Sequence, residues 1–314
     1  MLFVVEGPDK AGKTTLVKEL QAHLEGEVEV LHSGPIQRHP LDEYVRRVDC
    51  ALQEYDHVVC DRLHIGEQIY GPLLRGESRM PNYVEDWIDL YLRSRGAVLI
   101  WVDTPMTVIY NRIRSEGDEL IDVDQVKQIY LDYIAHFQQR GQRAVSLNPL
   151  RRSAYGSLLM EAAEHRDLES SVLASHDSYV GGRHVRHLFV GHERSSLAQR
   201  RGLPGAFAPY GWSSGAFLMQ ALDRFGETYC YGLVNAGEDP DLEHLVHVLE
   251  YPNLVALGIE ASSILAEHGL DHATVPHPQW VKRFHSMRGR QYGELLGRAA
   301  LTGDDATPKE LAAC

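Results

Sequence analysis

The stretch GPDKAGKT, residues 7–14, decides how the first half of the chain is interpreted. It fits the pattern GxxxxGK(S/T) and lies between an apolar, β-branched run, Leu2–Glu6, and a segment of helical periodicity, Thr14–Leu24. Glycines let successive backbone N–H groups turn toward phosphate oxygens, and the start of the following helix adds a favourable dipole. The spacing therefore predicts a phosphate-binding loop formed by Gly7, Lys10, Ala11, Gly12, Lys13, Thr14 and Thr15. Within it, Lys13 is expected to reach the β- and γ-phosphates of ATP and Thr14 to coordinate Mg²⁺.

Composition narrows the class of protein. The 314 residues are enough for two domains, and 44% hydrophobic with 24% charged residues is typical of a globular protein. No apolar run approaches the ~18 residues that span a bilayer, and the N-terminus lacks the features of a secretory signal, so we expect a cytoplasmic protein with no membrane partner. Four scattered cysteines without CxxC spacing predict neither a zinc site nor a disulfide framework. A net charge of −13 disfavours a generic nucleic-acid coat protein.

Strands and helices alternate in the first half, which predicts an α/β domain with a parallel sheet over residues 1–150. Strands are expected at Leu2–Glu6, Val28–Leu31, His57–Cys60, Ala97–Val102 and Ala144–Leu147, and helices at Thr14–Leu24, Leu41–Tyr55, Tyr83–Arg95, Met106–Arg114 and Val123–Arg140. Residues 151–183 are expected to form a helix, part of Leu150–His165, and a linker rich in Ser, Gly and His.

A second α/β pattern predicts a domain over residues 184–300, followed by a tail at 301–314. Strands are expected at His187–Val190, Tyr229–Val234, Leu254–Leu257 and Ala273–Val275, and helices at Gly215–Phe225, Asp241–Leu249, Glu260–His268 and Gln291–Arg298.

The opening FVVEGPDKAGKTT, residues 3–15, resembles that of the thymidylate kinase family, FxEGxDGxGKTT. Asp9 is the more telling match, because most P-loop NTPases have no acid at this position. The resemblance covers about residues 1–149 and implies a P-loop NTPase parallel sheet with helices on both faces. It also implies that Asp9 lies near the acceptor and positions phosphates or metal.

An Asp61-Arg62 pair follows the strand at residues 57–60, where open α/β sheets place ligand-binding residues. The resemblance implies that Arg62 clamps the acceptor phosphate, a task for which the bidentate guanidinium is suited. Asp61 is a candidate for both the acceptor site and the metal site. The chain then departs from the family and reads LHIGEQIYG, residues 63–71, so the identity of the acceptor stays open. His32, His64 and Glu67 are candidate acceptor contacts, or structural side chains.

The segment YNRIRSEGD, residues 110–118, resembles the family's LID. This implies that Arg112 and Arg114 stabilise the charge that develops on the transferred phosphoryl group; the alternative is a charged helix end. Asp103, after the fourth strand, is a candidate for holding metal-bound water. Asn148 follows the last strand, where the family cradles adenine.

The second half resembles the compact-cluster branch of the uracil-DNA glycosylase superfamily over residues 184–298. The resemblance is carried, in order, by HLFVGHE (187–193), a Gly/Pro/aromatic loop (202–215), LVN (233–235), VALGIEA (255–261) and VPHPQ (275–279). It implies a three-layer α/β domain in which an aromatic residue stacks on a base, Asn235 reads the base edge and the His277 loop approaches the sugar-phosphate. The candidate base site is Glu193, Phe207, Tyr210, Asn235 and His277.

The departures from that superfamily leave the chemistry open. The acid comes one residue late, as Glu193, Gln279 replaces the final Ser, and the cysteines that hold the branch's iron–sulfur cluster are absent. Base binding without glycosylase activity, a changed target, and a generic Rossmann-like domain with no base site are all compatible with this pattern.

Together the two halves predict an ATP- and Mg²⁺-dependent phosphotransferase that acts on a pyrimidine (deoxy)nucleoside monophosphate and carries a base-recognising second domain. One alternative is a kinase of 5-hydroxymethyluracil in DNA, which the acidity of both halves disfavours. The others are a bifunctional enzyme whose second domain hydrolyses an N-glycosidic bond, and a nucleotide-binding regulator. A basic and aromatic stretch at residues 280–290 keeps nucleic acid open as a partner of the second domain, and a homodimer is also open.

Overall fold

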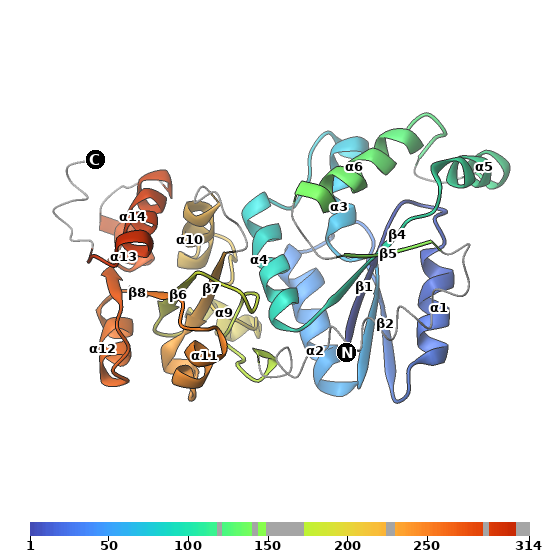
Figure 1. Ribbon diagram of the computed structural model, residues 1–314. Coiled ribbons are helices and arrows are strands. Elements are labelled where there is room, and N and C mark those ends of the chain that lie inside the picture. The colour runs from blue at the N-terminus through green and yellow to red at the C-terminus, as the bar shows by residue number, and fades with distance from the viewer. Residues whose placement is uncertain (118–120, 140–143, 149–172, 224–229, 285–288, 306–314) are drawn as a thin grey trace. The chain divides into compact units, whose positions relative to one another are not determined.

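The computed structural model describes residues 1–117, 121–139, 144–148, 173–223, 230–284 and 289–305 (Figure 1). The chain divides into two compact units. The first unit comprises Met1–Met80 and Ala97–Asp167, and the second comprises Pro81–Gly96 and Leu168–Cys314. The helix expected at Leu150–His165 and the last part of the tail lie outside the described residues.

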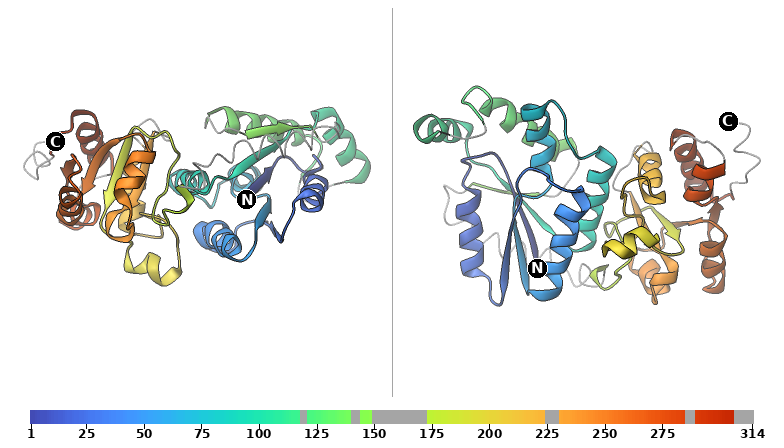
Figure 2. Two further views of the ribbon diagram at one scale, coloured as in Figure 1. Left: turned by 60° about the horizontal axis from the view of Figure 1, so that its bottom comes forward. Right: turned by 180° about the vertical axis from the view of Figure 1, so that it is seen from behind.

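A five-stranded parallel sheet forms the first unit, with strand order β2-β3-β1-β4-β5 and helices on both faces (Figures 1 and 2). This confirms the expected parallel α/β architecture. The strands are β1 (Leu2–Glu6), β2 (Val28–His32), β3 (His57–Asp61), β4 (Val98–Val102) and β5 (Ala144–Leu147). The helices are α1 (Lys13–His23), α2 (Arg46–Glu54, after a π-helical turn at Leu41–Val45), α3 (Ile65–Arg75), α5 (Met106–Glu116) and α6 (Val126–Gln139).

The central strand β1 is fully buried because it pairs with β3 on one side and β4 on the other, and its residues before Glu6 are apolar. Side chains alternate along the strand, so Phe3 and Val5 enter a core shared with residues of α1, α3, α5 and α6. The chain leaves β1 toward β2 but leaves β3 toward β4, which makes the gap between β1 and β3 a topological switch point. Ligands of open α/β sheets bind at the carboxyl ends of the strands at such a point.

Helix α3 was not expected from the sequence. Gly66, Gly71 and Pro72 all disfavour a helix interior. Burial of Ile65 and Ile69 in the core of the first unit offsets that preference, so tertiary packing decides the conformation of this segment.

The second unit contains a four-stranded parallel sheet with strand order β7-β6-β8-β9, flanked by helices (Figure 2). Its strands are β6 (His187–Gly191), β7 (Tyr231–Asn235), β8 (Asn253–Leu257) and β9 (Ala273–Val275). Its helices are α4 (Asn82–Ser94), α9 (Ser196–Arg201), α10 (Ser214–Leu222), α11 (Leu242–Val248), α12 (Ile259–Glu267), α13 (Pro278–Phe284) and α14 (Gly289–Thr302). All four expected strands of this half are present. Helices α9 and α13 were not expected.

Helix α4 differs most from expectation, because it lies in the chain between α3 and β4 but packs with the second unit. Trp87 of α4 stacks on Tyr91 with ring centroids 5.8 Å apart, and its Nε1 donates a hydrogen bond to the Ala206 carbonyl oxygen at 2.9 Å. Residues 173–183, expected as part of a linker, also pack there, and buried Val180 forms an antiparallel bridge with Leu233. The units therefore do not follow the expected boundaries near residues 150 and 184.

No helix within the described ranges has the length and apolar character needed to cross a membrane.

Candidate active site

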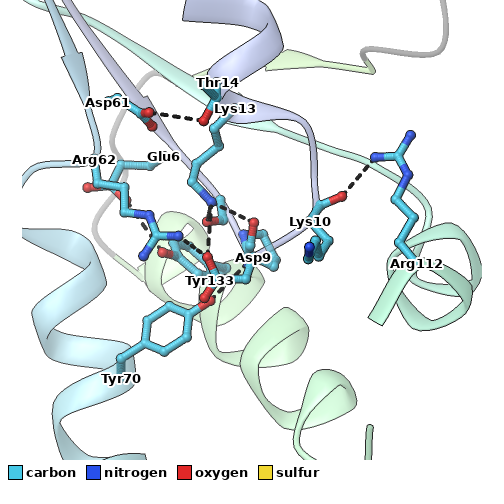
Figure 3. Close-up of polar contacts among 12 residues, drawn as sticks. Glu6, Asp9, Lys10, Lys13, Thr14, Asp61, Arg62, Tyr70, Arg112 and Tyr133 are labelled. Carbon is cyan, nitrogen blue, oxygen red and sulfur yellow. Dashed lines mark hydrogen bonds and ion pairs between the residues drawn. The ribbon is translucent and has the colours of Figure 1, made fainter. Parts of the chain in front are cut away.

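The phosphate-binding loop joins β1 to α1 at the switch point of the first sheet. Gly12 caps α1 with φ of 104°, and Lys10 has φ of 59°, so the loop closes on itself through left-handed backbone. Lys13 is buried, and its Nζ donates to the carbonyl oxygens of Gly7 at 2.8 Å and Pro8 at 2.6 Å (Figure 3). The same Nζ lies 3.8 Å from Asp9 Oδ1. The cation is thus held inside the loop, where phosphate oxygens would replace these neutral acceptors.

Thr14 and Asp61 form the part of the site that fits a divalent cation. Thr14 Oγ1 donates to Asp61 Oδ2 at 3.2 Å, and His32 Nδ1 lies 3.5 Å from the same oxygen. Asp61 Oδ1 is buried and has no hydrogen-bond partner among the described residues. Mg²⁺ is usually bound through one or two protein oxygens together with substrate phosphates and waters. The hydroxyl and the orphaned carboxylate oxygen suit that coordination, and no cluster of three or more His, Cys, Asp or Glu is found in the described ranges to suggest another metal site.

Arg62 lies beside the loop in a left-handed conformation, with φ of 67°. Its guanidinium forms an ion pair with Asp9 Oδ1 and lies 5.8 Å from the ring centroid of Tyr70, whose hydroxyl accepts a hydrogen bond from the Asp9 N–H at 3.0 Å. Asp9 therefore links the phosphate-binding loop to the arginine that follows β3 (Figure 3).

Glu6, at the end of β1, stabilises the turn that follows β3. Its Oε1 accepts the Leu63 N–H at 2.8 Å, and its Oε2 accepts the Tyr133 hydroxyl at 3.4 Å. Burial raises the pKa of the Glu6 carboxyl, and the hydrogen bond from Leu63 opposes that shift. The stretch FVVEGPDKAGKTT includes Glu6, but its pattern predicted no role for this residue. Tyr70 and Tyr133 were not expected at the site either, because α3 and α6 lie far from the loop in sequence.

Helix α5 brings one of the two LID arginines to the loop. Arg112 Nη1 donates to the Lys10 carbonyl oxygen at 2.8 Å, and Lys10 Nζ pairs with Glu116 at 3.2 Å. Arg114 is exposed and does not line the cavity described next. Glu116 was not expected at the site.

These residues surround one polar cavity of about 370 Å³. It is lined by Asp9, Lys10, Gly12, Lys13, Thr14, Thr15, His32, Asp61, Arg62, Arg112 and Glu116. Four cationic side chains and the loop's backbone therefore converge on a space next to the Thr14–Asp61 pair.

Four candidate residues lie elsewhere in the first unit. Asp103 accepts hydrogen bonds from Tyr130 at 3.0 Å and Ser146 at 3.4 Å, so both oxygens of its carboxylate are engaged beyond β4. Glu67 is buried, forms an ion pair with Arg75 and accepts the Arg79 N–H at 2.8 Å. His64 is buried edge-on against Tyr44, with ring centroids 6.5 Å apart. Asn148 is half-buried after β5 and does not line the cavity.

A second cluster lies at the carboxyl ends of the strands in the second unit. Gly191 ends β6 opposite Asn235, which ends β7. A Cβ atom at Gly191 would lie 2.5 Å from Phe207 Cζ and 2.8 Å from Asn235 Oδ1, so the ring and the amide approach each other only because residue 191 is glycine. Phe207 itself has φ of 51°, a strained value for a non-glycine residue.

Two histidines, His192 and His277, border this cluster. Burial lowers the pKa of His277, nearby Glu260 opposes the shift, and the second histidine, His192, adds to it. His192 occupies the position where the superfamily's acid was expected, and its imidazole packs against Gly237. Of the other candidate base-site residues, Glu193 is exposed, and Tyr210 is half-buried with Arg201 5.1 Å from its ring centroid.

No protein-family model matches the chain, and no curated protein matches it. Solved structures match about half of it. The YorR protein of Bacillus subtilis, in complex with phosphorylated GDP, is 19% identical with a TM-score of 0.43, over 53% of this chain and 99% of that chain. Deoxyadenosine kinase from M. mycoides with bound dATP is 15% identical with a TM-score of 0.37, over 52% of this chain and 100% of that chain.

Proposed function

We propose that the first unit is an ATP- and Mg²⁺-dependent phosphotransferase whose acceptor is a pyrimidine (deoxy)nucleoside monophosphate. One observation carries the proposal. The phosphate-binding loop, the Thr14–Asp61 pair, Arg62 and Arg112 line a single cavity at the switch point of a parallel sheet.

The chain's own residues supply positioning and charge. Lys13 exchanges its contacts with the Gly7 and Pro8 carbonyl oxygens for phosphate oxygens of ATP, and Arg62, paired with Asp9 in this structure, is within reach of an acceptor phosphate. Arg112 approaches from the opposite side of the loop and balances charge on the group in transit. Thr14 and Asp61 would hold Mg²⁺, which would neutralise phosphate charge when bound. Phosphoryl transfer needs little covalent assistance, so this arrangement accounts for the chemistry.

The kinase proposal is tested with labelled ATP and a panel of nucleotides together with hydroxymethylated DNA. We expect label on a pyrimidine monophosphate and a loss of about a hundredfold or more in Lys13→Ala. Lys18→Ala, an exposed lysine on the same helix, is the matched control and should retain full activity. Label on DNA alone would identify the DNA kinase instead. If no acceptor is labelled although ATP binding still depends on Lys13, the nucleotide-binding regulator replaces the kinase.

We further propose that the second unit recognises a nucleobase. The approach of Phe207 and Asn235 at Gly191 favours this, because an aromatic ring and an amide are the usual partners of an unstacked base. Binding of nucleosides that is lost in Asn235→Ala would support the proposal, and binding unaffected by that change would refute it. Release of free base that is lost in His277→Ala would add the hydrolase activity.

A further inference from the structure

Asp61 and Arg62 are adjacent in the chain, yet both line the phosphate cavity of the first unit. Asp61 ends β3, and successive side chains of a strand point to opposite faces, so a fully extended Arg62 would point away from Asp61. Instead, Arg62 has φ of 67°, and its guanidinium lies against Asp9 (Figure 3). One left-handed residue therefore brings the metal candidate and the phosphate clamp to the same space.

This conformation of Arg62 depends on the contacts around it. A residue with a long side chain rarely adopts left-handed backbone, and it stays there only where its surroundings enforce it. Two hydrogen bonds hold the backbone at this point. The Arg62 N–H donates to the Val5 carbonyl oxygen at 3.0 Å, and the Leu63 N–H donates to Glu6 Oε1 at 2.8 Å.

The two hydrogen bonds differ in what they require of the sequence. The bond to Val5 continues the ladder in which Val5 is paired with Asp61, so any residue at position 5 supplies that carbonyl group. The bond to Glu6 requires a side chain of the right length that carries an acceptor. Glu6 has no exposed surface and Leu63 is 3% exposed, so water does not readily replace the carboxyl group. Glu6 is thus the side chain that fixes the peptide directly after the left-handed residue.

We infer that Glu6 is a positioning residue of the acceptor site. By accepting the Leu63 N–H, it stabilises the turn that directs the Arg62 guanidinium into the cavity. It does so through the reach of its acceptor oxygen and not through its charge. The inference rests on the proposed phosphotransferase activity and deepens it, because it names a residue that controls acceptor affinity from behind the cavity that the acceptor would enter.

Two substitutions separate reach from charge. Glu6→Gln keeps the length and an oxygen that accepts the Leu63 N–H, but it removes the charge. Burial raises the pKa of Glu6, so a neutral group is already favoured at this position. Glu6→Asp keeps the acid but is one methylene shorter, which withdraws the oxygen from Leu63.

Steady-state kinetics of the full chain measure the consequence, with labelled ATP and the pyrimidine monophosphate that the acceptor panel identifies. We expect Glu6→Asp to raise the acceptor KM about tenfold or more and Glu6→Gln to stay within about threefold of the wild type. The ATP KM should stay within about threefold in both, because the side-chain hydrogen bonds of Glu6 go to Leu63 and Tyr133 and not to the phosphate-binding loop. Glu54→Asp, at an exposed glutamate that ends α2, is the matched control and should change neither KM.

Two further measurements show whether the effect passes through Arg62. In an Arg62→Ala background the clamp is absent, so Glu6→Asp should change the acceptor KM by less than about twofold. Hydrogen exchange of the Leu63 amide, followed by NMR, requires no activity. The amide should be protected in the wild type and in Glu6→Gln, and it should exchange about tenfold faster or more in Glu6→Asp.

The outcomes distinguish this inference from the kinase proposal. An unchanged acceptor KM in Glu6→Asp, or a larger effect of Glu6→Gln than of Glu6→Asp, overturns the role of Glu6 and leaves the kinase standing. The same conclusion follows if Glu6→Asp acts equally strongly in the Arg62→Ala background. Rapid exchange of the Leu63 amide in the wild type overturns the inference even where a variant does not fold. If the wild type labels no acceptor, the proposed function is refuted and the inference fails with it.

Discussion

Trp87→Phe tests the assignment of α4 to the second unit. The indole is fully buried, and its Nε1 is 2.9 Å from the carbonyl oxygen of Ala206, a residue with no exposed surface. Phenylalanine cannot donate, so that buried carbonyl loses a partner at a cost of about 1–3 kcal/mol. The smaller ring also leaves part of the indole volume unfilled, which adds about 1 kcal/mol. We therefore expect the second unit to lose about 2–4 kcal/mol of unfolding free energy, a large part of a typical domain's 5–15 kcal/mol.

Urea denaturation of the full chain, with and without an ATP analogue, measures this loss. An analogue bound to the first unit raises the midpoint of that unit's transition, which identifies it by mass action. The variant should lower the midpoint of the other transition only. Trp212→Phe is the matched control, because Trp212 is also in the second unit but 90% exposed, and it should shift neither midpoint. A Trp87→Phe effect confined to the analogue-sensitive transition, or one below about 0.5 kcal/mol, would refute the assignment.

Three further predictions concern charged groups. Burial raises the pKa of Glu6 above its ordinary value of 4.5, so folding favours the protonated carboxyl. The free energy of unfolding of the wild type should therefore fall, relative to that of Glu6→Gln, as pH rises above about 4.5. Equal pH profiles of the two proteins in urea denaturation would contradict this. Asp61→Asn should weaken the apparent Mg²⁺ affinity of the kinase reaction by about tenfold or more. Asp103→Asn is the control and should leave that affinity unchanged, because Tyr130 and Ser146 already engage the Asp103 carboxylate. Equal effects of the two variants in a Mg²⁺ titration would contradict a role for Asp61 in the metal site. Burial lowers the pKa of His277 below its ordinary value of 6.5, so folding favours the neutral imidazole and stability should fall as pH drops below about 6.5. Glu260→Gln should lower the His277 pKa further in an NMR titration, and an unchanged or higher pKa would contradict the interaction with Glu260.

The features that could be predicted from the sequence are those set by short local motifs. The glycine pattern from Gly7 to Thr14 constrains backbone geometry within a few residues, and β1 is apolar from Leu2 to Val5, the residues that pair with β3. The parallel sheet of the first unit could therefore be predicted, as could the position of Asp61 at the end of β3. Contacts that join distant segments could not be predicted. That Tyr130 engages Asp103 depends on how α6 packs beside β4, which no spacing in the sequence encodes.

Helices without a clear pattern were the other source of error. Helix α3 contains residues that disfavour helices, and its formation follows from burial in the core. The periodicity of α4 predicted a helix correctly. Its acidic residues Glu85, Asp86 and Asp89 are buried together with its apolar residues, so its polar positions do not show which layer it covers. The hydrogen bond from the Asn235 amide to Glu238 was not predicted, for a third reason. Glu238 lies in a 3₁₀ turn, Ala236–Glu238, that brings its carboxylate back to Asn235 three residues earlier, and a single acid after a strand gives no sign of this.

Helix α4 bears on whether the two proposed activities can be separated. A fragment that begins at Leu168 would contain both parallel strands of the candidate base site, β6 and β7, but would lack Trp87. The Ala206 carbonyl oxygen would lose its donor, directly before Phe207, whose left-handed backbone is already strained. Strain of this kind persists only where surrounding contacts enforce it, so we expect the fragment to lose the position of the Phe207 ring before it loses its sheet. We therefore expect the second unit to require residues 81–96, which lie in the chain between two segments of the first unit, and base recognition is best assayed on the full chain.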